Sequence, residues 1–338
     1  MRIGTNPEKE NNQLTYESYH RVVIPVYIPN LEEDYFKDGL KIFELCIKSL
    51  LKTVHSKTRI SLIDNGCCNE ASDYLQQLFN THPEIDQLLK SKINLGKVNA
   101  IYSAVKSNLE PLITISDADV MFLDNWQTEV EQVFRSFPEA GMVSPVPSSI
   151  AYRGKHLNST IYYALFKGKL DFKTVEDRNG LEKFQESVGR TMYNENHLSK
   201  YLVVSNRRGE AVIGCGHFVA TLRAQVFEKS PKGPSRLKIV GGSENKYIDI
   251  PNDQSGFLRL ATKNNLAYHL GNSYEEWMND TMRQITRNEK ESYLSTEELN
   301  NVQSINGIKI RIGAILHKIL FRKFKRQYFQ IKGIKGDY

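Results

Sequence analysis

The sequence contains no stretch of about 18 consecutive apolar residues, the length that a transmembrane helix requires. Its first residues are polar and of mixed charge, so we expect no signal peptide and a cytoplasmic protein. Cysteine is scarce, with 4 in 338 residues, and no pair has the CxxC spacing of a zinc site. The adjacent Cys67 and Cys68 are poorly placed for a structural disulfide, so we expect reduced thiols. These absences argue against a membrane-spanning protein and against a disulfide-stabilised secreted domain.

What the chain does contain is an alternation of strand-like and helix-like patterns through its first 145 residues. With 40% hydrophobic residues, it can bury a large core. This alternation predicts an α/β fold with a mostly parallel central sheet, whose ligands bind outside the carboxyl ends of the strands. Strands are predicted over residues 21–28, 59–63, 92–94 and 112–122, and helices over 40–51, 70–79, 98–107 and 126–137.

The second half of the chain is less regular. Residues 148–200 are polar and mixed, and no element is predicted there. Further along, we predict strands over 141–145, 201–204 and 266–270, an ordered segment over 211–222 and a helix over 255–264.

The clearest chemical feature is a pair of aspartates, Asp117 and Asp119, at the end of the apolar run 112–122. Carboxylates next to a buried strand are costly unless they hold a cation or hydrogen-bond a ligand. Residues two apart in an extended chain lie on the same face, so the two carboxylates can reach neighbouring parts of one ligand. One can therefore hold a divalent cation while the other contacts a neighbouring group, an arrangement that suits a metal-bound diphosphate of a nucleotide.

Several short motifs in the first 125 residues carry a family resemblance. They are Val-Val-Ile-Pro-Val-Tyr (22–27), Leu-Ile-Asp-Asn-Gly (62–66), Asn-Leu-Gly-Lys (94–97) and Ile-Ser-Asp-Ala-Asp-Val (115–120). Their types and order resemble the motifs of family 2 glycosyltransferases with the Rossmann-like GT-A fold. The likeness is thinner afterwards, where the glycine-containing segment 214–218 resembles the acceptor loop of that family.

The resemblance implies a nucleotide site at the ends of the first strands. Asp64 would hydrogen-bond the base, commonly uracil, and Asp117 would contact the ribose or the base edge. The residues that the resemblance places around the nucleotide are Pro25, Val26, Tyr27, Asp64, Asn94, Lys97, Asp117 and Ala118.

The resemblance also implies a metal ligand and a general base. Asp119 would bind Mn²⁺ or Mg²⁺ between the two phosphates, and His269 is a candidate second ligand. Asp253 would deprotonate the acceptor hydroxyl. Asn252 stands before it where the family usually has Glu, and Arg259 follows as the family pattern expects.

The implied activity is metal-dependent, inverting transfer of a hexosyl or N-acetylhexosaminyl group. The donor would be a nucleotide sugar, of the UDP type, and the acceptor a hydroxyl of a glycan or lipid-linked molecule in surface polysaccharide synthesis. The physical logic agrees, because a divalent ion neutralises the departing diphosphate and a carboxylate on the other side of the sugar activates the hydroxyl. No covalent enzyme nucleophile is needed.

Two other functions remain open. The motif at 115–120 also fits a haloacid-dehalogenase phosphatase, with Asp117 as the nucleophile, although two strand–helix units precede it here. The chain could also be a non-catalytic scaffold that binds nucleotide sugars. The candidate residues have ordinary alternatives as well: a turn for Asp64, a solvated surface for Lys97, a tight turn for 214–218, a helix N-cap for Asp253 and a structural role for His269.

Positive charge is concentrated at the end of the chain. Residues 299–336 contain nine Lys or Arg and no Asp or Glu, whereas residues 1–298 hold 36 basic and 38 acidic residues. Isoleucines at 308, 312, 315 and 319 recur with helical spacing among these cations. The pattern predicts a basic amphipathic helix that either lies on an anionic membrane or packs on its own domain. Nucleic acid is not an expected partner, since no recognition motif accompanies the charge.

The predicted organisation has four parts. Residues 1–20 form an extension, 21–145 the nucleotide-sugar-binding half, 146–272 the acceptor-binding half, and 273–338 a helical extension with its amphipathic segment at 305–332.

Overall fold

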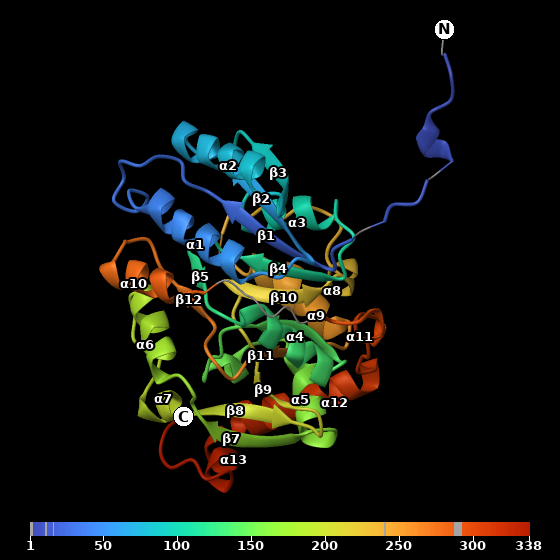
Figure 1. The fold of residues 1–338 in the computed structure, drawn as a ribbon. Coiled ribbons are helices and arrows are strands. Elements are labelled where there is room, and N and C mark those ends of the chain that lie inside the picture. Colours follow the sequence, from blue (N-terminus) through green and yellow to red (C-terminus); the bar gives the residue numbers. More distant parts are fainter. Residues whose placement is uncertain (1–2, 11, 16, 240, 287–292) are drawn as a thin grey trace.

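The structure is a computed structural model that describes residues 3–10, 12–15, 17–239, 241–286 and 293–338. A ten-stranded sheet runs through the molecule, and helices cover its faces (Figure 1). The first half of the chain builds a parallel sheet in the order β3-β2-β1-β4, with helices as the connections. Its elements are β1 (His20–Val26), α1 (Gly39–Thr53), β2 (Thr58–Asn65), α2 (Asn69–Thr81), β3 (Ile85–Ser91), α3 (Lys97–Val105) and β4 (Leu112–Ser116).

The second half of the chain continues the same sheet in the order β10-β6-β11-β9-β8-β7. Strand β10 runs against both of its neighbours, whereas β6 and β11 are parallel to each other. Following the pairings, β3, β2, β1, β4, β6, β11 and β8 share one direction, and β10, β9 and β7 oppose it. The predicted α/β architecture with a mostly parallel central sheet flanked by helices is confirmed. The strands of this half are β6 (Ala140–Ser144), β7 (Lys169–Thr174), β8 (Lys200–Ser205), β9 (Glu210–Ile213), β10 (Val219–Arg223) and β11 (Leu258–Ala261).

A small second sheet pairs β5 (Val120–Phe122) with β12 (Ala267–His269). No helix of the described residues combines the length and the apolar composition needed to cross a bilayer. The remaining helices are α4 (Trp126–Ser136), α5 (Asn158–Phe166), α6 (Arg178–Ser187), α7 (Glu195–Ser199), α8 (Gln225–Glu228), α9 (Ile250–Gln254), α10 (Glu276–Gln284), α11 (Thr296–Asn300), α12 (Gly307–Lys318) and α13 (Lys325–Ile331), with short 3₁₀ or π turns η1 (Pro7–Lys9), η2 (Ala151–Arg153), η3 (Asn245–Asp249) and η4 (Ile319–Lys323).

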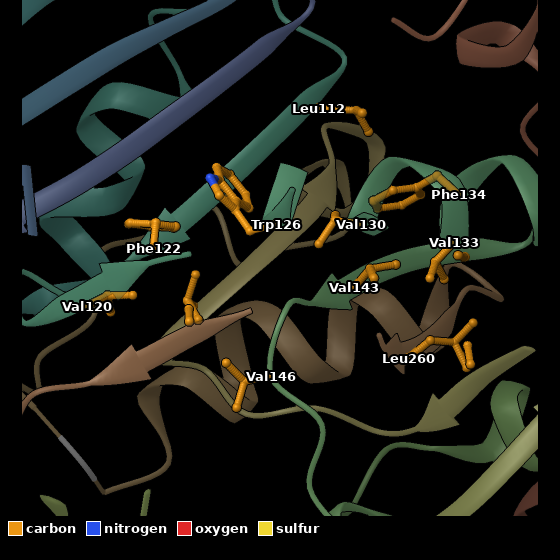
Figure 2. Close-up of a cluster of buried hydrophobic side chains, with 14 of the residues drawn as sticks. Leu112, Val120, Phe122, Trp126, Val130, Val133, Phe134, Val143, Val146 and Leu260 are labelled. Carbon is orange, nitrogen blue, oxygen red and sulfur yellow. The ribbon is translucent and has the colours of Figure 1, made fainter. Parts of the chain in front are cut away.

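Helix α4 is fixed to the sheet by large apolar side chains (Figure 2). Trp126 and Phe122 are fully buried, with ring centroids 4.8 Å apart, and the indole N–H donates to the Thr53 hydroxyl at 3.0 Å. Burying side chains of this size contributes roughly 2–3 kcal/mol each. The packing joins α1, β5 and α4, and so fixes the chain that directly follows the aspartate pair.

The structure corrects three predicted elements. The strand predicted over 112–122 is two strands in two sheets, because the chain leaves the main sheet after Ser116 and re-pairs from Val120. The strand predicted over 92–94 lies earlier, at β3. The helix predicted over 255–264 is wrong: α9 ends before Gly256, which has φ +79°, and the following residues form β11. The periodicity of a short apolar run does not distinguish a helix from a strand. Here the segment forms a strand because it pairs with β6 and β9. The four-part division of the chain stays a prediction.

Candidate functional site

The carboxyl ends of β1, β2 and β4 meet at one edge of the sheet because these strands are parallel. Val26 lies opposite Asp64 in the β1–β2 register. One carboxylate oxygen of Asp64 accepts hydrogen bonds from the N–H groups of Gly66, at 3.2 Å, and Cys67, at 2.9 Å. Asp64 therefore does occupy a turn, as one alternative held, and it also stands at the strand edge where a nucleotide site is predicted.

The loop after β3 is tied to the loop after β2 by two asparagines. The Asn94 amide oxygen accepts from the Asn65 side chain at 3.1 Å and from the Gly96 N–H at 2.8 Å. The Asn65 amide oxygen in turn accepts from the Leu95 N–H at 2.9 Å. Gly96 has φ +83°, a conformation that suits glycine, and the next residue begins α3. These contacts place Asn94 and Lys97 at the same edge as Asp64.

Lys97 is not a solvated lysine. Its ammonium lies 2.6 Å from Asp117 and 2.8 Å from Glu244, and only 15% of its side chain is exposed. Burial alone would lower the pKa of Lys97, but the two carboxylates outweigh burial and raise it. The cation therefore stays charged and links α3, the β4 end and the segment before η3. Glu244 had no sequence motif to mark it, because its partner lies in a distant part of the chain.

The two aspartates have different surroundings. The backbone N–H of Asp117 donates to the Phe218 carbonyl at 2.7 Å, which joins the β4 end to the loop before β10. The Asp119 carboxylate has one oxygen, Oδ2, 3.5 Å from His269 Nε2. Its other oxygen, Oδ1, is buried and has no hydrogen-bond partner among the described residues. Burial raises the pKa of Asp119 to about 6, against the opposing charge of His269.

His269 is brought to Asp119 by the β5–β12 pairing, in which it lies opposite Val120. The backbone N–H of Leu270 also donates to the Asp119 carbonyl, at 2.8 Å. On its far side, His269 Nδ1 contacts the Ser187 hydroxyl at 2.9 Å, a contact that orients the ring with Nε2 toward the carboxylate. The unpartnered buried carboxylate oxygen fits Mn²⁺ or Mg²⁺, and the neighbouring imidazole nitrogen suits Mn²⁺ better than Mg²⁺. The predicted metal ligands Asp119 and His269 are therefore adjacent.

The same edge of the sheet carries the other predicted nucleotide-site residues, Pro25, Val26, Tyr27 and Ala118. Val26 is fully buried, and its carbonyl accepts from the Cys67 thiol at 3.3 Å. Tyr27 is 40% exposed and packs edge-on against Phe36, with ring centroids 5.8 Å apart. Pro25 is partly buried in β1, and Ala118 is partly buried between the two aspartates. Tyr27 is thus the member of this set that offers an accessible ring.

Asp253 makes a different set of contacts. Its carboxylate accepts from the Asn158 side chain at 2.6 Å and from the Ser159 N–H at 2.9 Å, so it caps the N-terminus of α5. The Ser159 hydroxyl also donates to the Asp253 carbonyl, at 3.1 Å. Burial raises the pKa of Asp253. None of these contacts connects it to Asp117 or Asp119, and its role as general base stays a prediction.

A second acid, Asp249, is connected to the aspartate edge. It lies 2.6 Å from His217 Nε2 and 2.8 Å from the Arg259 guanidinium. Burial would raise the pKa of Asp249, but Arg259 and His217 hold it below its usual range. The carbonyl of His217 accepts from the Lys97 ammonium at 3.4 Å, so the dyad joins the network around Lys97. His217, which could have been a plain surface residue, is only 21% exposed. No motif in the sequence marked Asp249.

A second group of potential metal ligands lies at the start of β1, away from this edge. The ligand atoms of His20, His55 and Glu131 all lie within 4.8 Å of one another and are buried. One Glu131 oxygen contacts His20 Nδ1 and His55 Nε2, both at 3.0 Å, and the other accepts from the Tyr19 hydroxyl at 2.8 Å. The free ring nitrogens contact threonine hydroxyls. Within the described residues every polar atom of this histidine–glutamate cluster has a protein partner.

Comparisons with known proteins give structural similarity alone. No protein-family model matches the chain, and no curated protein matches its sequence. The chain is similar to the mannosyltransferase PcManGT from Pyrobaculum calidifontis in complex with GDP-Man and Mn²⁺, with a TM-score of 0.44 and 15% identity over 76% of this chain and 58% of that one. It therefore spans less than two thirds of the length of the mannosyltransferase. It is also similar to S. aureus TarS 1-349, with a TM-score of 0.43 and 12% identity over 90% of this chain and 73% of that one. Both TM-scores lie below 0.5, so nothing about either protein's substrates is carried over to this chain.

Proposed function

We propose that the protein is a metal-dependent, inverting glycosyltransferase that uses a nucleotide-sugar donor. The observation that carries the proposal is the unpartnered, buried Oδ1 of Asp119 beside His269, at the edge where Asp64, Asn94 and Lys97 also gather. A buried oxygen without a partner costs free energy unless a ligand satisfies it. A divalent cation with a nucleoside diphosphate would satisfy it and would also match the motif resemblance.

The chain's own residues would divide the work as follows. Asp64 and the exposed ring of Tyr27 would contact the nucleoside, and Asp117 the ribose. Lys97 would hold Asp117 in place, because its ammonium is fixed between two carboxylates. Asp119 and His269 would hold Mn²⁺ or Mg²⁺, which when bound supplies Lewis-acid neutralisation of the departing diphosphate.

The general base has two candidates. Asp253 is the candidate from the motif resemblance, but both of its oxygens serve the start of α5. Asp249 is the second candidate. Both of its oxygens are also paired, with His217 and Arg259, but it differs from Asp253 in sharing a network with Lys97 through His217. We expect Asp249→Asn to reduce transfer far more than donor hydrolysis, and Asp253→Asn to lower the free energy of unfolding. The reverse pattern would restore Asp253 as the base.

The finer assignments remain proposals that depend on the resemblance. They are a UDP-type donor, a hexosyl or N-acetylhexosaminyl group, and a hydroxyl acceptor on a glycan or lipid-linked molecule in surface polysaccharide synthesis. We further propose that the chain acts in the cytoplasm, at the inner face of the cell membrane.

A thermal-shift panel tests the proposal. UDP, GDP and ADP are each measured with and without Mn²⁺, on the wild type and on Asp119→Asn, with the exposed Asp280→Asn as the matched control. A specific ligand at 100 times its Kd stabilises the folded state by about 2.7 kcal/mol, so a positive result is a clear rise in Tm. We expect one diphosphate to raise Tm only with Mn²⁺, in the wild type and the control. If no diphosphate does so, the proposal fails.

Two further measurements separate the two other functions. A phosphatase would form a phosphoaspartate at Asp117, which a phosphate analogue would trap. A non-catalytic scaffold would bind a diphosphate and yet release no sugar to water or acceptor. We expect neither outcome, because the Asp117 carboxylate lies 2.6 Å from the Lys97 ammonium and the proposed metal ligands Asp119 and His269 lie beside it.

A further inference from the structure

The basic tail is anchored on its own domain by one face of α12. Gly313 lies so close to α5 that a Cβ at that position would collide with the Asn158 carbonyl. His317 is buried one turn later, with Nε2 3.3 Å from the Tyr152 carbonyl, and Phe321 is buried in η4. In Figure 1, α12 runs beside α5 at the end of the sheet that carries β7 and β8. The tail is therefore a fixed surface.

The opposite face of α12 is apolar and exposed. Ile308, Ile312, Ile315 and Ile319 follow one another at intervals of four, three and four residues, which places them in one stripe. They are 73%, 39%, 59% and 38% exposed, respectively, and Phe324 continues the surface at 44%. A helix that only packed on its domain would carry polar residues on this side. An isoleucine stripe turned to solvent indicates a contact with something outside the chain.

Cations border this isoleucine stripe. Arg311, Lys318, Arg322 and Lys323 are exposed, and none of them forms an ion pair with any residue of the described ranges. Residues 299–336 contain no acid that could pair with them. Unpaired cations around an apolar stripe are complementary to a surface that is negatively charged outside and apolar beneath.

Three of these cations also line an open cleft between the tail and the start of α5. The cleft has a volume of about 630 Å³ and is bordered by Lys318, Arg322 and Lys323 from the tail and by Lys155 and His156 from the domain. This basic cleft is large enough for a phosphate headgroup, and its charge favours one. The carboxylate of Asp253 interacts electrostatically with His156. Both of its oxygens already accept hydrogen bonds, from Asn158 and Ser159 at the start of α5.

We propose that the isoleucine stripe and the basic cleft together dock the protein on an anionic phospholipid bilayer. The isoleucines would enter the boundary between headgroups and acyl chains, and the basic cleft would take a lipid phosphate. Because α12 is locked to α5 at Gly313, docking would orient the whole domain on the membrane. The inference goes beyond the transfer reaction, since it depends on residues far along the chain from Asp117 and Asp119.

Vesicle flotation tests the proposal without donor or metal. The full chain is mixed with vesicles of phosphatidylcholine alone or with added phosphatidylglycerol, at low and high salt. We expect binding to the anionic vesicles, weaker at high salt, and little binding to the neutral ones. I312S/I315S should bind at least about tenfold more weakly. R322Q/K323Q should bind about thirtyfold more weakly, because each cation near an anionic surface contributes about 1 kcal/mol and about 1.36 kcal/mol corresponds to a factor of ten.

The matched controls are variants of exposed residues elsewhere. Leu109→Ser, at a 49% exposed leucine, and K229Q/K232Q should bind like the wild type. We expect unchanged Tm values for all of these variants, because the substituted side chains are exposed. Such values would show that folding is intact. Asp119→Asn should keep full vesicle binding, so that failure of the transfer proposal and failure of this one are separate results.

Three outcomes would overturn the proposal. The wild type could remain unbound with anionic vesicles, or I312S/I315S could bind as well as the wild type. Light scattering could also show a dimer that I312S/I315S converts to a monomer, in which case the isoleucine stripe covers a second copy of the chain.

Discussion

Two groups of acidic and histidine side chains lie at opposite ends of the same strands. One is the edge cluster of Asp117, Asp119 and His269, after the carboxyl end of β4. The other is the histidine–glutamate cluster, at the start of β1 and beneath α4. Both combine carboxylates with imidazoles, and both residue types can ligate a metal.

Hydrogen-bond satisfaction separates them. In the histidine–glutamate cluster both oxygens of Glu131 accept hydrogen bonds, and the far ring nitrogens contact Thr58 and Thr114. In the edge cluster Asp119 keeps a buried oxygen without a partner among the described residues. A satisfied network stabilises the fold, whereas a buried oxygen without a partner is a candidate for ligand binding, and at Asp119 the neighbouring imidazole and the strand edge favour it. We therefore assign stability to the first and ligand binding to the second.

The largest expected effect is on the edge cluster. Asp119→Ala should lower transfer roughly a thousandfold, about 4 kcal/mol of transition-state stabilisation, because it removes a ligand of the proposed cation. Steady-state transfer with a nucleotide-sugar donor and Mn²⁺ measures it. Asp280→Ala, an exposed acid on α10, is the control. Normal turnover by Asp119→Ala would end the metal assignment.

The next effect is on the histidine–glutamate cluster. Glu131→Gln should lower the free energy of unfolding by about 3 kcal/mol, because the amide has one acceptor oxygen where the carboxylate has two. Its NH2 group would then face either the Tyr19 hydroxyl or the two histidines, and the negative charge is lost. Urea denaturation measures it, with the exposed Glu129→Gln on the same helix as the control. The folded fraction should retain its Mn²⁺-dependent Tm shift with diphosphate. Loss of that shift would mean that the two clusters are not separate in function.

Lys97 connects the edge cluster to the rest of the site. Lys97→Met should weaken diphosphate binding roughly tenfold, about 1.4 kcal/mol, because Asp117 and Glu244 then repel each other and the nucleotide. Isothermal titration with Mn²⁺ present measures the Kd. Lys48→Met, at an exposed lysine, should bind like the wild type. An unchanged Kd in Lys97→Met would remove Lys97 from the nucleotide site.

The smallest effect is a difference in pH dependence. Burial lowers the pKa of His20, so the unfolded chain takes up a proton near its usual 6.5 and the folded chain does not. Burial would raise the pKa of Glu131, but hydrogen bonds from His20 and His55 hold it below its usual 4.5. The free energy of unfolding should therefore fall as pH drops through 6.5, by at most about 1.4 kcal/mol per pH unit for one group, and again below 4.5.

Asp119 contributes the opposite slope. Its pKa is raised to about 6, so the stability that its protonated form contributes is lost as pH rises through that value. Asp119→Asn should therefore make the loss of stability on acidification steeper than in the wild type. Urea denaturation at several pH values without metal measures both slopes. A shallower loss in Asp119→Asn would contradict the burial of this carboxylate.

Local pattern was sufficient where neighbours in the sequence are also neighbours in space. The apolar strand before Asp117 and the turn after Asp64 are set by adjacent residues, and the parallel order of β1, β2 and β4 follows from the helices between them. The same logic failed at residues 255–264, where a short apolar run became β11. Pairing with β6 and β9 outweighs any local preference there.

The amino-acid sequence alone determined the α/β class, the strand edge that collects Asp64, Lys97 and the aspartate pair, and the basic, amphipathic character of the tail. Tertiary structure alone decided the partners: Glu244 for Lys97, the start of α5 for Asp253, and solvent for one face of α12. The physical reason is that hydrogen bonds, ion pairs and burial act over a few ångströms of space. Segments far apart in the chain come within that distance only after the sheet and its helices have packed.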